Sequence, residues 1–329
     1  MDPTPLAGAE FARAAATGDV YGHLAGLGGS VVVVDADELP DRLDPDAMDR
    51  LVTLPAVVVA RTTSPGRRPD WADLVSAPGD PLLDAVAATV AAQPLASTVL
   101  ALLLRTSGGR SIPEGLVAES TAYGLLQAGP EFSHWRAAHP VRVRTEPDGP
   151  PVRVVRRGDE LTVTLDRPHV RNALDSAMRD GLVEALTVAA RDPSVTVVHL
   201  RGSGDSFCSG GDLDEFGTRA DPATAHLVRL LSSPARSVAE VAGRAVAHLH
   251  GDVVGSGIEL AAFAGRVIAT PTTRISLPEV GLGLIPGAGG TVSLPRRIGR
   301  HLTLRLALSP GPIDADTALG WGLVDGLTG

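Results

Sequence analysis

The chain has 329 residues, which is enough for one large domain or two ordinary ones with a sizeable core. Its 38 acidic residues outnumber the 29 basic ones, and the formal net charge of −9 argues against a nucleic-acid partner held by a basic face. All 29 basic residues are arginine, so catalysis that needs a lysine amine, as in Schiff-base and P-loop enzymes, is excluded.

A single cysteine, Cys208, excludes an internal disulfide framework and a zinc site built from cysteines. We find no basic patch followed by an apolar segment near the N-terminus, the pattern of a secretory signal. The longest strongly apolar stretch, Pro94 to Leu104, is too short to cross a bilayer. These features predict a cytoplasmic protein without a membrane partner.

The first half of the chain predicts two short buried strands and several helices. The strands are the runs Val31 to Val34 and Ala56 to Ala60. Helices are predicted over residues 45–54, 81–105, 113–128 and 131–138, with a break in the second of them near Pro94.

A polar run rich in proline and glycine, Thr145 to Pro151, predicts a boundary between an N-terminal extension, 1–148, and a second domain, 149–329. In the second domain, strands are predicted over 152–155, 161–165, 195–201, 245–249, 267–269 and 274–276, and helices over 175–190 and from about residue 257. This alternation predicts a layered α/β fold.

The loop Phe207 to Leu213 follows the predicted strand that ends at Arg201. Its consecutive small residues allow backbone N–H groups to face a ligand without side chains in the way. A Gly-Gly-Asp sequence also makes an ordinary turn, so the loop by itself leaves both interpretations open.

Two glutamates stand in two further glycine-rich segments. Glu259 follows a tight Gly/Ser turn at the start of a predicted helix, where an acid is also common because of the helix dipole. Glu279 stands in an apolar loop, where desolvation disfavours the ionised form and suits the carboxyl to proton transfer near neutral pH. The alternative for Glu279 is a loop glutamate bonded to backbone amides.

Taken together, these segments resemble the enoyl-CoA hydratase/isomerase (crotonase) superfamily over residues 152–325. The motifs that carry the resemblance are Arg167-Pro168 with Asn172-Ala173-Leu174, Phe207 to Leu213, Gly255 to Ala261, and Pro278-Glu279 with Pro286 to Thr291. The spacing between Glu259 and Glu279 matches that of the family's two active-site acids. The resemblance implies the crotonase-like (ClpP/crotonase) fold, an α/β spiral of ββα units.

The resemblance also implies a chemistry. In this family two backbone N–H groups hold the thioester carbonyl of a coenzyme A substrate, and motif position assigns them to Ser209 and Ser256. Smaller residues usually stand at both positions. Glu279 is expected to deliver a proton to the α-carbon and Glu259 to activate water. Because an isomerase chiefly needs the position of Glu279, the presence of Glu259 favours hydration.

The expected partner is an acyl-CoA, with no separate cofactor because coenzyme A is part of the substrate. By resemblance, the coenzyme lies along Ala173, Gly210, Gly211, Asp212 and Leu213. Arg171 is the nearest candidate for a phosphate contact, with a solvated loop arginine as the alternative. His248 and His250 share one face of a strand, but no third ligand follows at a suitable spacing, so no metal is expected. The resemblance further implies a homo-oligomer, either a trimer or a hexamer.

Members of this family normally continue past the segment that corresponds to Gly322-Leu323-Val324 with helices that cover the acyl pocket. Segments of similar order and spacing stand in the first half of this chain, at Gln93 to Arg105, Gly115 to Ser120, Glu131 to Arg136 and Pro140. This similarity leads to the hypothesis that residues 81–140 of the α-rich extension replace those C-terminal helices. An unrelated helical domain is the alternative.

The leading interpretation is a hydratase of acyl-CoA and fatty acid metabolism, a lyase that adds water to, or removes it from, a 2,3-unsaturated acyl-CoA. Isomerisation, decarboxylation or carbon–carbon hydrolysis through the same enolate are alternatives, as is a catalytically silent assembly partner. A serine peptidase on the related ClpP-type fold is a further alternative, although Ser256 lacks the flanking Gly-x-Ser-x-Gly pattern.

Overall fold

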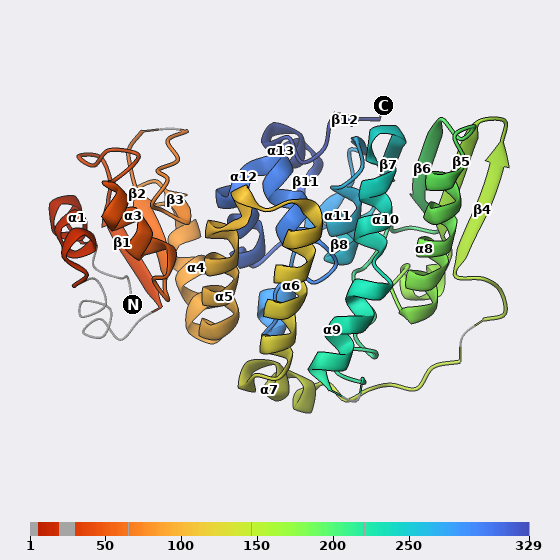
Figure 1. The fold of residues 1–329 in the computed structure, drawn as a ribbon, viewed down its shortest axis with the longest axis horizontal. Coiled ribbons are helices and arrows are strands. Elements are labelled where there is room, and N and C mark those ends of the chain that lie inside the picture. The colour runs from red at the N-terminus through yellow and green to blue at the C-terminus, as the bar shows by residue number, and fades with distance from the viewer. Residues whose placement is uncertain (1–5, 20–29, 65, 146, 220, 329) are drawn as a thin grey trace.

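The computed structural model describes residues 6–19, 30–64, 66–145, 147–219 and 221–328. Three parts follow one another along the long axis of the molecule (Figure 1). A small sheet with its helices lies at the N-terminal end, a group of helices follows, and the larger sheets occupy the other end.

The N-terminal sheet is parallel, with its strands in the order β1-β2-β3. Its elements are α1 (Gly8–Thr17), β1 (Val31–Asp35), α3 (Pro45–Val52), β2 (Val57–Arg61) and β3 (Leu74–Ser76). Alternate side chains of β1 point to opposite faces, so Val32 and Val34 pack with Phe11 of α1 while Val33 joins the main core. Burial on both faces explains the unbroken apolar runs that predicted β1 and β2, and both strands are confirmed.

The helical part comprises α4 (Pro81–Ala92), α5 (Pro94–Arg105), η1 (Ser107–Gly109), α6 (Ile112–Gln127) and α7 (Pro130–Ala138). The predicted break at Pro94 is confirmed, because the chain bends by 113° there. Ser111 and Glu114 form a capping box at the start of α6, so this helix begins where its sequence specifies.

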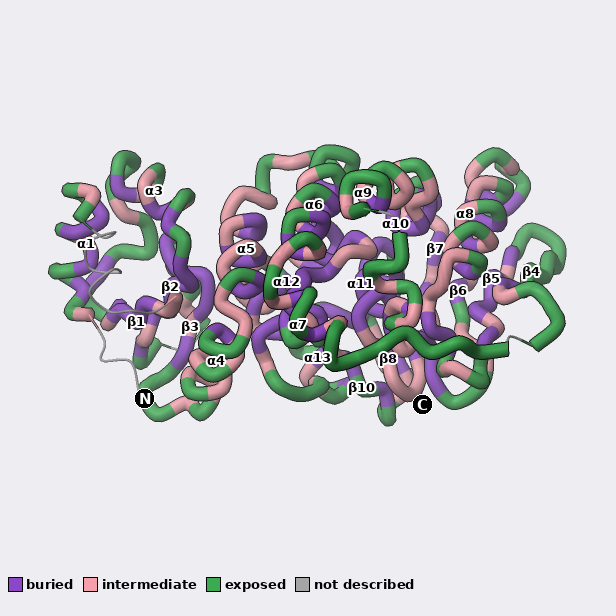
Figure 2. Tube along the Cα trace, turned by 90° about the horizontal axis from the view of Figure 1, so that it is seen from below, coloured by how far each residue is buried: buried purple, intermediate pink, exposed green. Residues whose placement is uncertain are grey.

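An exposed segment leads from α7 toward β4 and passes along the surface of the molecule (Figure 2). Arg142 and Arg144 fix it by ion pairs with Asp214, and Arg144 also pairs with Asp212. The predicted boundary, Thr145 to Pro151, lies in this segment, apart from Glu146, which is outside the described residues.

The largest sheet has six strands in the order β12-β9-β7-β6-β5-β4, and only the pair β4–β5 is antiparallel. A smaller sheet has the order β11-β10-β8. The strands are β4 (Val152–Arg157), β5 (Glu160–Leu165), β6 (Val197–Gly202), β7 (Ala245–Leu249), β8 (Asp252–Val254), β9 (Arg266–Ala269), β10 (Arg274–Ser276), β11 (Ile313–Asp314) and β12 (Gly326–Leu327). The six strands predicted for this half correspond to β4, β5, β6, β7, β9 and β10.

Helices cover and connect these sheets. They are η2 (Pro168–Val170), α8 (Ser176–Arg191), α9 (Pro222–Leu231), α10 (Pro234–Glu240), η3 (Ala242–Arg244), α11 (Ser256–Ala261), η4 (Glu279–Leu282), α12 (Gly290–Leu308) and α13 (Ala315–Trp321). The sequence predicted α8 and α11 but not the long α12, which has Pro295 within it and a non-helical residue at Gly299.

One hydrophobic cluster of buried residues extends from Val33 to Val324 and includes side chains of α4 to α7. Helices α5 and α6 pack on α12. A Cβ atom at Gly115 of α6 would lie 2.9 Å from a methyl group of Val292, so glycine permits this close approach. The core is therefore continuous across residue 148, and the division into domains at that position stays a prediction.

Within the described residues, no single helix has both the length and the apolar composition to cross a bilayer. The bent pair of helices at 81–92 and 94–109 meets those two criteria only when both are taken together.

Candidate active site

The loop from Phe207 to Leu213 is held against its neighbours at both ends. Cys208 bridges to Val253, and Gly211 bridges to Leu174. Between these bridges, the Ser209 N–H donates to the carbonyl oxygen of Arg171 at 2.9 Å. The Ser209 amide is thus occupied within the protein, so its assignment to the thioester was wrong.

The reason lies in the preceding loop. Arg171 and Asn172 both have left-handed backbones, with φ of 53° and 56°. Buried Asn172 fixes this conformation, because its side-chain amide donates to the carbonyl oxygens of Ser203 and Ser206. The carbonyl of Arg171 is thereby positioned to accept from Ser209.

Two other amides face a cavity instead. Among the hydrogen bonds of the described residues, the N–H groups of Gly211 and Ser256 have no acceptor. Both residues line one cavity of about 210 Å³. Ser256 is the first residue of α11, where backbone N–H groups have no partner within the helix. The amides of Ser256 and Gly211, and not that of Ser209, are therefore free to donate to a ligand in this cavity.

Glu279 lines the same cavity from η4. It is buried, and its Oε2 atom has no hydrogen-bond partner among the described residues. Gly255 has φ of 48°, and a Cβ atom there would lie 2.1 Å from Oε1 of Glu279, so only glycine leaves room for the carboxyl. Burial, with a smaller contribution from the charge of Glu119, raises the pKa of Glu279 to about 7.

Glu259 is also buried and lines the cavity from α11. Its Oε2 atom accepts hydrogen bonds from the amides of Ala288 at 2.7 Å and Gly290 at 2.8 Å. Burial raises the pKa of Glu259, and the nearby charges of Glu279 and then Glu119 raise it further. The two amides oppose this shift because they stabilise charge on Glu259, but burial outweighs them.

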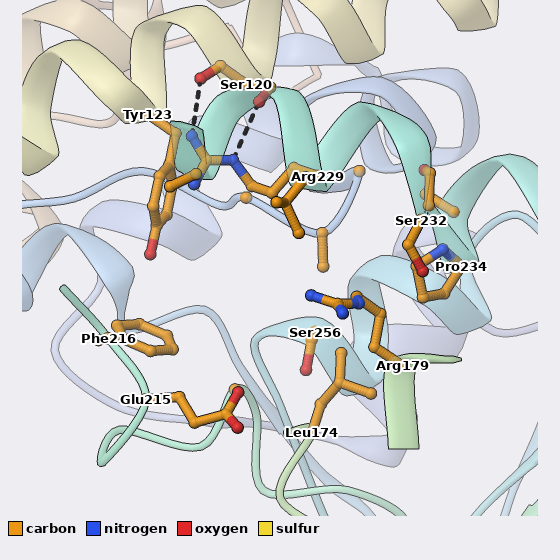
Figure 3. Close-up of a pocket in the computed structure, with 18 of the residues that line it drawn as sticks. Ser120, Tyr123, Leu174, Arg179, Glu215, Phe216, Arg229, Ser232, Pro234 and Ser256 are labelled. Carbon is orange, nitrogen blue, oxygen red and sulfur yellow. Dashed lines mark hydrogen bonds between the residues drawn. The ribbon is translucent and has the colours of Figure 1, made fainter. Parts of the chain in front are cut away.

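The cavity has two distinct sides (Figure 3). Ser256, Leu174 and Glu215 lie along one side, and Tyr123 and Arg229 lie along the other. Helix α6 contributes Leu116, Glu119, Ser120 and Tyr123 to the lining. The hypothesis about residues 81–140 requires a position near the two glutamates for both Leu116 and Trp135; Leu116 lines the cavity, whereas Trp135 does not.

Sequence reasoning missed Glu119. Its Oε1 accepts from the Gly289 amide at 2.7 Å, and its Oε2 accepts from the amide and hydroxyl of Thr291 at 2.8 and 2.7 Å. Burial raises its pKa to about 7. An available signal was its helical register, because Glu119 lies on the same face of the predicted helix as Leu116 and Tyr123.

Replacing Glu119 with glutamine is expected to lower kcat by about tenfold. The NH₂ group of glutamine would face N–H donors of the loop at 289–291, and amides of this loop also bind Glu259. Losing the charge of Glu119 lowers the pKa of both Glu259 and Glu279, so the acidic and the basic limbs of the pH–rate profile should both move to lower pH. The control is Glu114→Gln in the exposed capping box of α6. An unmoved pH–rate profile in Glu119→Gln would show that Glu119 is not coupled to Glu259 and Glu279.

Only some of the residues predicted to contact the coenzyme line the cavity. Gly211 and Asp212 line the cavity, whereas Arg171, Ala173, Gly210 and Leu213 are not among its lining residues. Asp212 is buried and paired with Arg144 and Arg167, which places its carboxylate in the scaffold. Arg171 is exposed and lies 3.7 Å from Asp252, so its contact with a phosphate stays a prediction.

The histidines of β7 and the segment after it have protein partners. His248 contacts His199, with 2.9 Å between ring nitrogens, and burial lowers the pKa of His248 to about 4. His250 contacts the carbonyl oxygen of Gly204. Within the described parts of the chain, no group of three or more His, Cys, Asp or Glu side chains is arranged to hold a metal ion.

The Ser256 hydroxyl has one hydrogen-bond partner among the described residues, the sulfur of Cys208 at 3.9 Å. A peptidase nucleophile needs a base such as histidine within hydrogen-bond reach. The arrangement around Ser256 therefore does not support the peptidase alternative.

Comparison with known proteins gives consistent matches. Residues 160–328, slightly more than half of the chain, match the model of the enoyl-CoA hydratase/isomerase family. The 2,3-dehydroadipyl-CoA hydratase of Escherichia coli is 37% identical over 172 residues, which cover 52% of this chain and 66% of the relative. The 1,2-epoxyphenylacetyl-CoA isomerase of the same bacterium is 32% identical over 168 residues, covering 50% and 64%.

Among solved structures, enoyl-CoA hydratase from Thermoplasma volcanium aligns with a TM-score of 0.50 at 33% identity. The alignment covers 55% of this chain and 72% of that one. The predicted crotonase-like fold is thus confirmed. The chain spans less than two thirds of the length of the curated relatives named above.

Proposed function

Because the chain belongs to the enoyl-CoA hydratase/isomerase family, we propose that it adds water to, or removes it from, a 2,3-unsaturated acyl-CoA. The observation that supports this proposal best is one cavity lined by two buried glutamates and two backbone amides without acceptors. An isomerase that moves a proton between two carbons needs one carboxyl, whereas the addition of water needs a base and an acid.

In the proposed reaction, the amides of Gly211 and Ser256 donate to the thioester oxygen. The carboxylate of Glu259 takes a proton from water, whose oxygen bonds to the β-carbon. The electron pair of the carbon–carbon double bond moves toward the thioester oxygen, and Glu279 then gives its proton to the α-carbon. Each amide is expected to stabilise the enolate by about 3–4 kcal/mol, as in other oxyanion holes.

The helices of residues 81–140 have a part in this proposal. With Leu116 and Tyr123, α6 covers the cavity, which supports the hypothesis that these helices replace a C-terminal cover. The expected trimer or hexamer stays a prediction, as does the absence of a separate cofactor.

The test is hydration of crotonyl-CoA, followed by the loss of absorbance of its conjugated thioester. Turnover that depends on Glu259 and Glu279 would support the proposal. Migration of the double bond in a 3-enoyl-CoA without hydration of crotonyl-CoA would favour an isomerase. No turnover of any enoyl-CoA would favour the silent assembly partner.

The pH dependence of kcat/KM follows from the raised pKa values of the two glutamates. Glu279 can deliver a proton only below its own pKa, so activity should fall above about pH 7 as this proton leaves. It should fall again at lower pH, where the raised pKa of Glu259 leaves this carboxylate protonated and unable to act as the base. A profile measured from pH 5 to 10 checks this, and constant activity between pH 5 and 8 would contradict it.

A further inference from the structure

One side of the cavity carries polar groups that the proposed reaction does not use. Arg229 of α9 donates from Nε to the Ser120 hydroxyl at 2.9 Å and from Nη2 to the Ser120 carbonyl at 3.2 Å. Its guanidinium lies over the ring of Tyr123, 4.6 Å from the ring centre. Figure 3 shows these three residues together, across the cavity from Ser256.

Arg229 has no carboxylate within ion-pair distance in the described part of the chain, although the charge of Glu119 acts on it from farther away. No ion pair of Arg229 occurs there, whereas Arg179, another arginine of the lining, pairs with Asp180 at 2.8 Å. Glu119 is on the same helix as Ser120, but both of its oxygens accept from residues 289–291. A partly buried guanidinium stays charged, so it favours an anion that enters the cavity.

Tyr123 adds a second donor on this side. The residue is 7% exposed, and its hydroxyl points into the cavity and has no hydrogen-bond partner among the described residues. Burial raises the pKa of Tyr123, so the phenol remains protonated and able to donate. The ring packs against Gly287, where a Cβ atom would lie 2.5 Å from it, and this contact fixes its position next to the glutamates' loop.

We propose that the acyl group of the substrate ends in a carboxylate, which Arg229 and Tyr123 bind at the end of the cavity away from the thioester. This proposal rests on the proposed function, since the amides of Gly211 and Ser256 set the position of the thioester. Charged hydrogen bonds from a guanidinium are stronger than neutral ones, and the phenol completes a pair of donors for the two carboxylate oxygens.

The experiment compares two six-carbon 2-enoyl-CoA substrates, one with a terminal carboxylate and one with a terminal methyl group. We expect kcat/KM to be at least about tenfold higher for the carboxylate. Arg229→Met should remove this preference and Tyr123→Phe should reduce it, because each lowers kcat/KM for the carboxylate substrate more than for the methyl substrate. Arg236→Met, which removes an exposed arginine paired with Glu240, should leave the preference unchanged.

Equal rates for the two substrates in the wild type would overturn the inference, as would an equal loss for both in Arg229→Met. Thermal unfolding of Arg229→Met and Arg229→Lys shows whether a loss arises from misfolding. If no enoyl-CoA is hydrated, the proposed function fails, and calorimetry then decides the inference alone. In that case, adipyl-CoA should bind at least about tenfold more tightly than hexanoyl-CoA, and equal affinities would refute carboxylate recognition.

Discussion

Replacing Glu279 with glutamine is expected to lower kcat by about 10²–10⁴-fold, the usual contribution of a positioned general acid. Glutamine has nearly the same shape and fits beside Gly255, but it has no proton to deliver to the α-carbon. Because the amides of Gly211 and Ser256 are unchanged, the affinity for a saturated acyl-CoA should stay within a few-fold of wild type. Steady-state kinetics with crotonyl-CoA and calorimetry with butyryl-CoA measure the two quantities.

Glu240→Gln is the matched control, because Glu240 is an exposed glutamate that pairs with Arg236 at 3.7 Å. It should retain wild-type kinetics. If Glu279→Gln turned over as fast as Glu240→Gln, the assignment of proton delivery to Glu279 would be wrong.

Replacing Asp73 with asparagine is expected to destabilise the fold by about 3–5 kcal/mol, the cost of leaving a buried charge without its partner. Asp73 is 2% exposed and pairs with the buried Arg105 of α5, with 2.8 Å between Oδ1 and Nε. It also accepts from the Val58 amide at 2.8 Å and pairs with Arg300 of α12 at 3.4 Å. The residue thus joins the N-terminal sheet to two helices of the main core.

Urea unfolding monitored by circular dichroism measures this loss. Asp166→Asn removes a more exposed ion pair, Arg153–Asp166 at 3.1 Å, and should cost no more than about 1 kcal/mol. Similar midpoints for the two variants would show that the junction at Asp73 contributes little to stability.

Much of the site could be predicted from sequence because its motifs are local. Glu259 and Glu279 each stand in a short segment whose glycines and apolar neighbours indicate burial, and both line the cavity. The prediction for Ser209 failed because the partner of an amide depends on a second loop. The left-handed Arg171 directs its carbonyl to Ser209, and no spacing within 207–213 reports that contact.

Other features depend on pairs far apart in the chain. Asp73 and Arg105 lie 32 positions apart without a shared pattern, and Arg229 meets Ser120 from a different helix. Glu119 is an intermediate case, because its place on an apolar helix face was visible while its acceptor role at the start of α12 was not. The helix that it binds was itself absent from the predicted elements.

A crystal structure with acetoacetyl-CoA tests the central claim most directly. We predict that the thioester oxygen lies within about 2.7–3.1 Å of the amide nitrogens of both Gly211 and Ser256. We also predict that the carboxyl of Glu279 faces the α-carbon. A thioester bound outside this cavity, or held by the Ser209 amide with Gly211 uninvolved, would contradict the account.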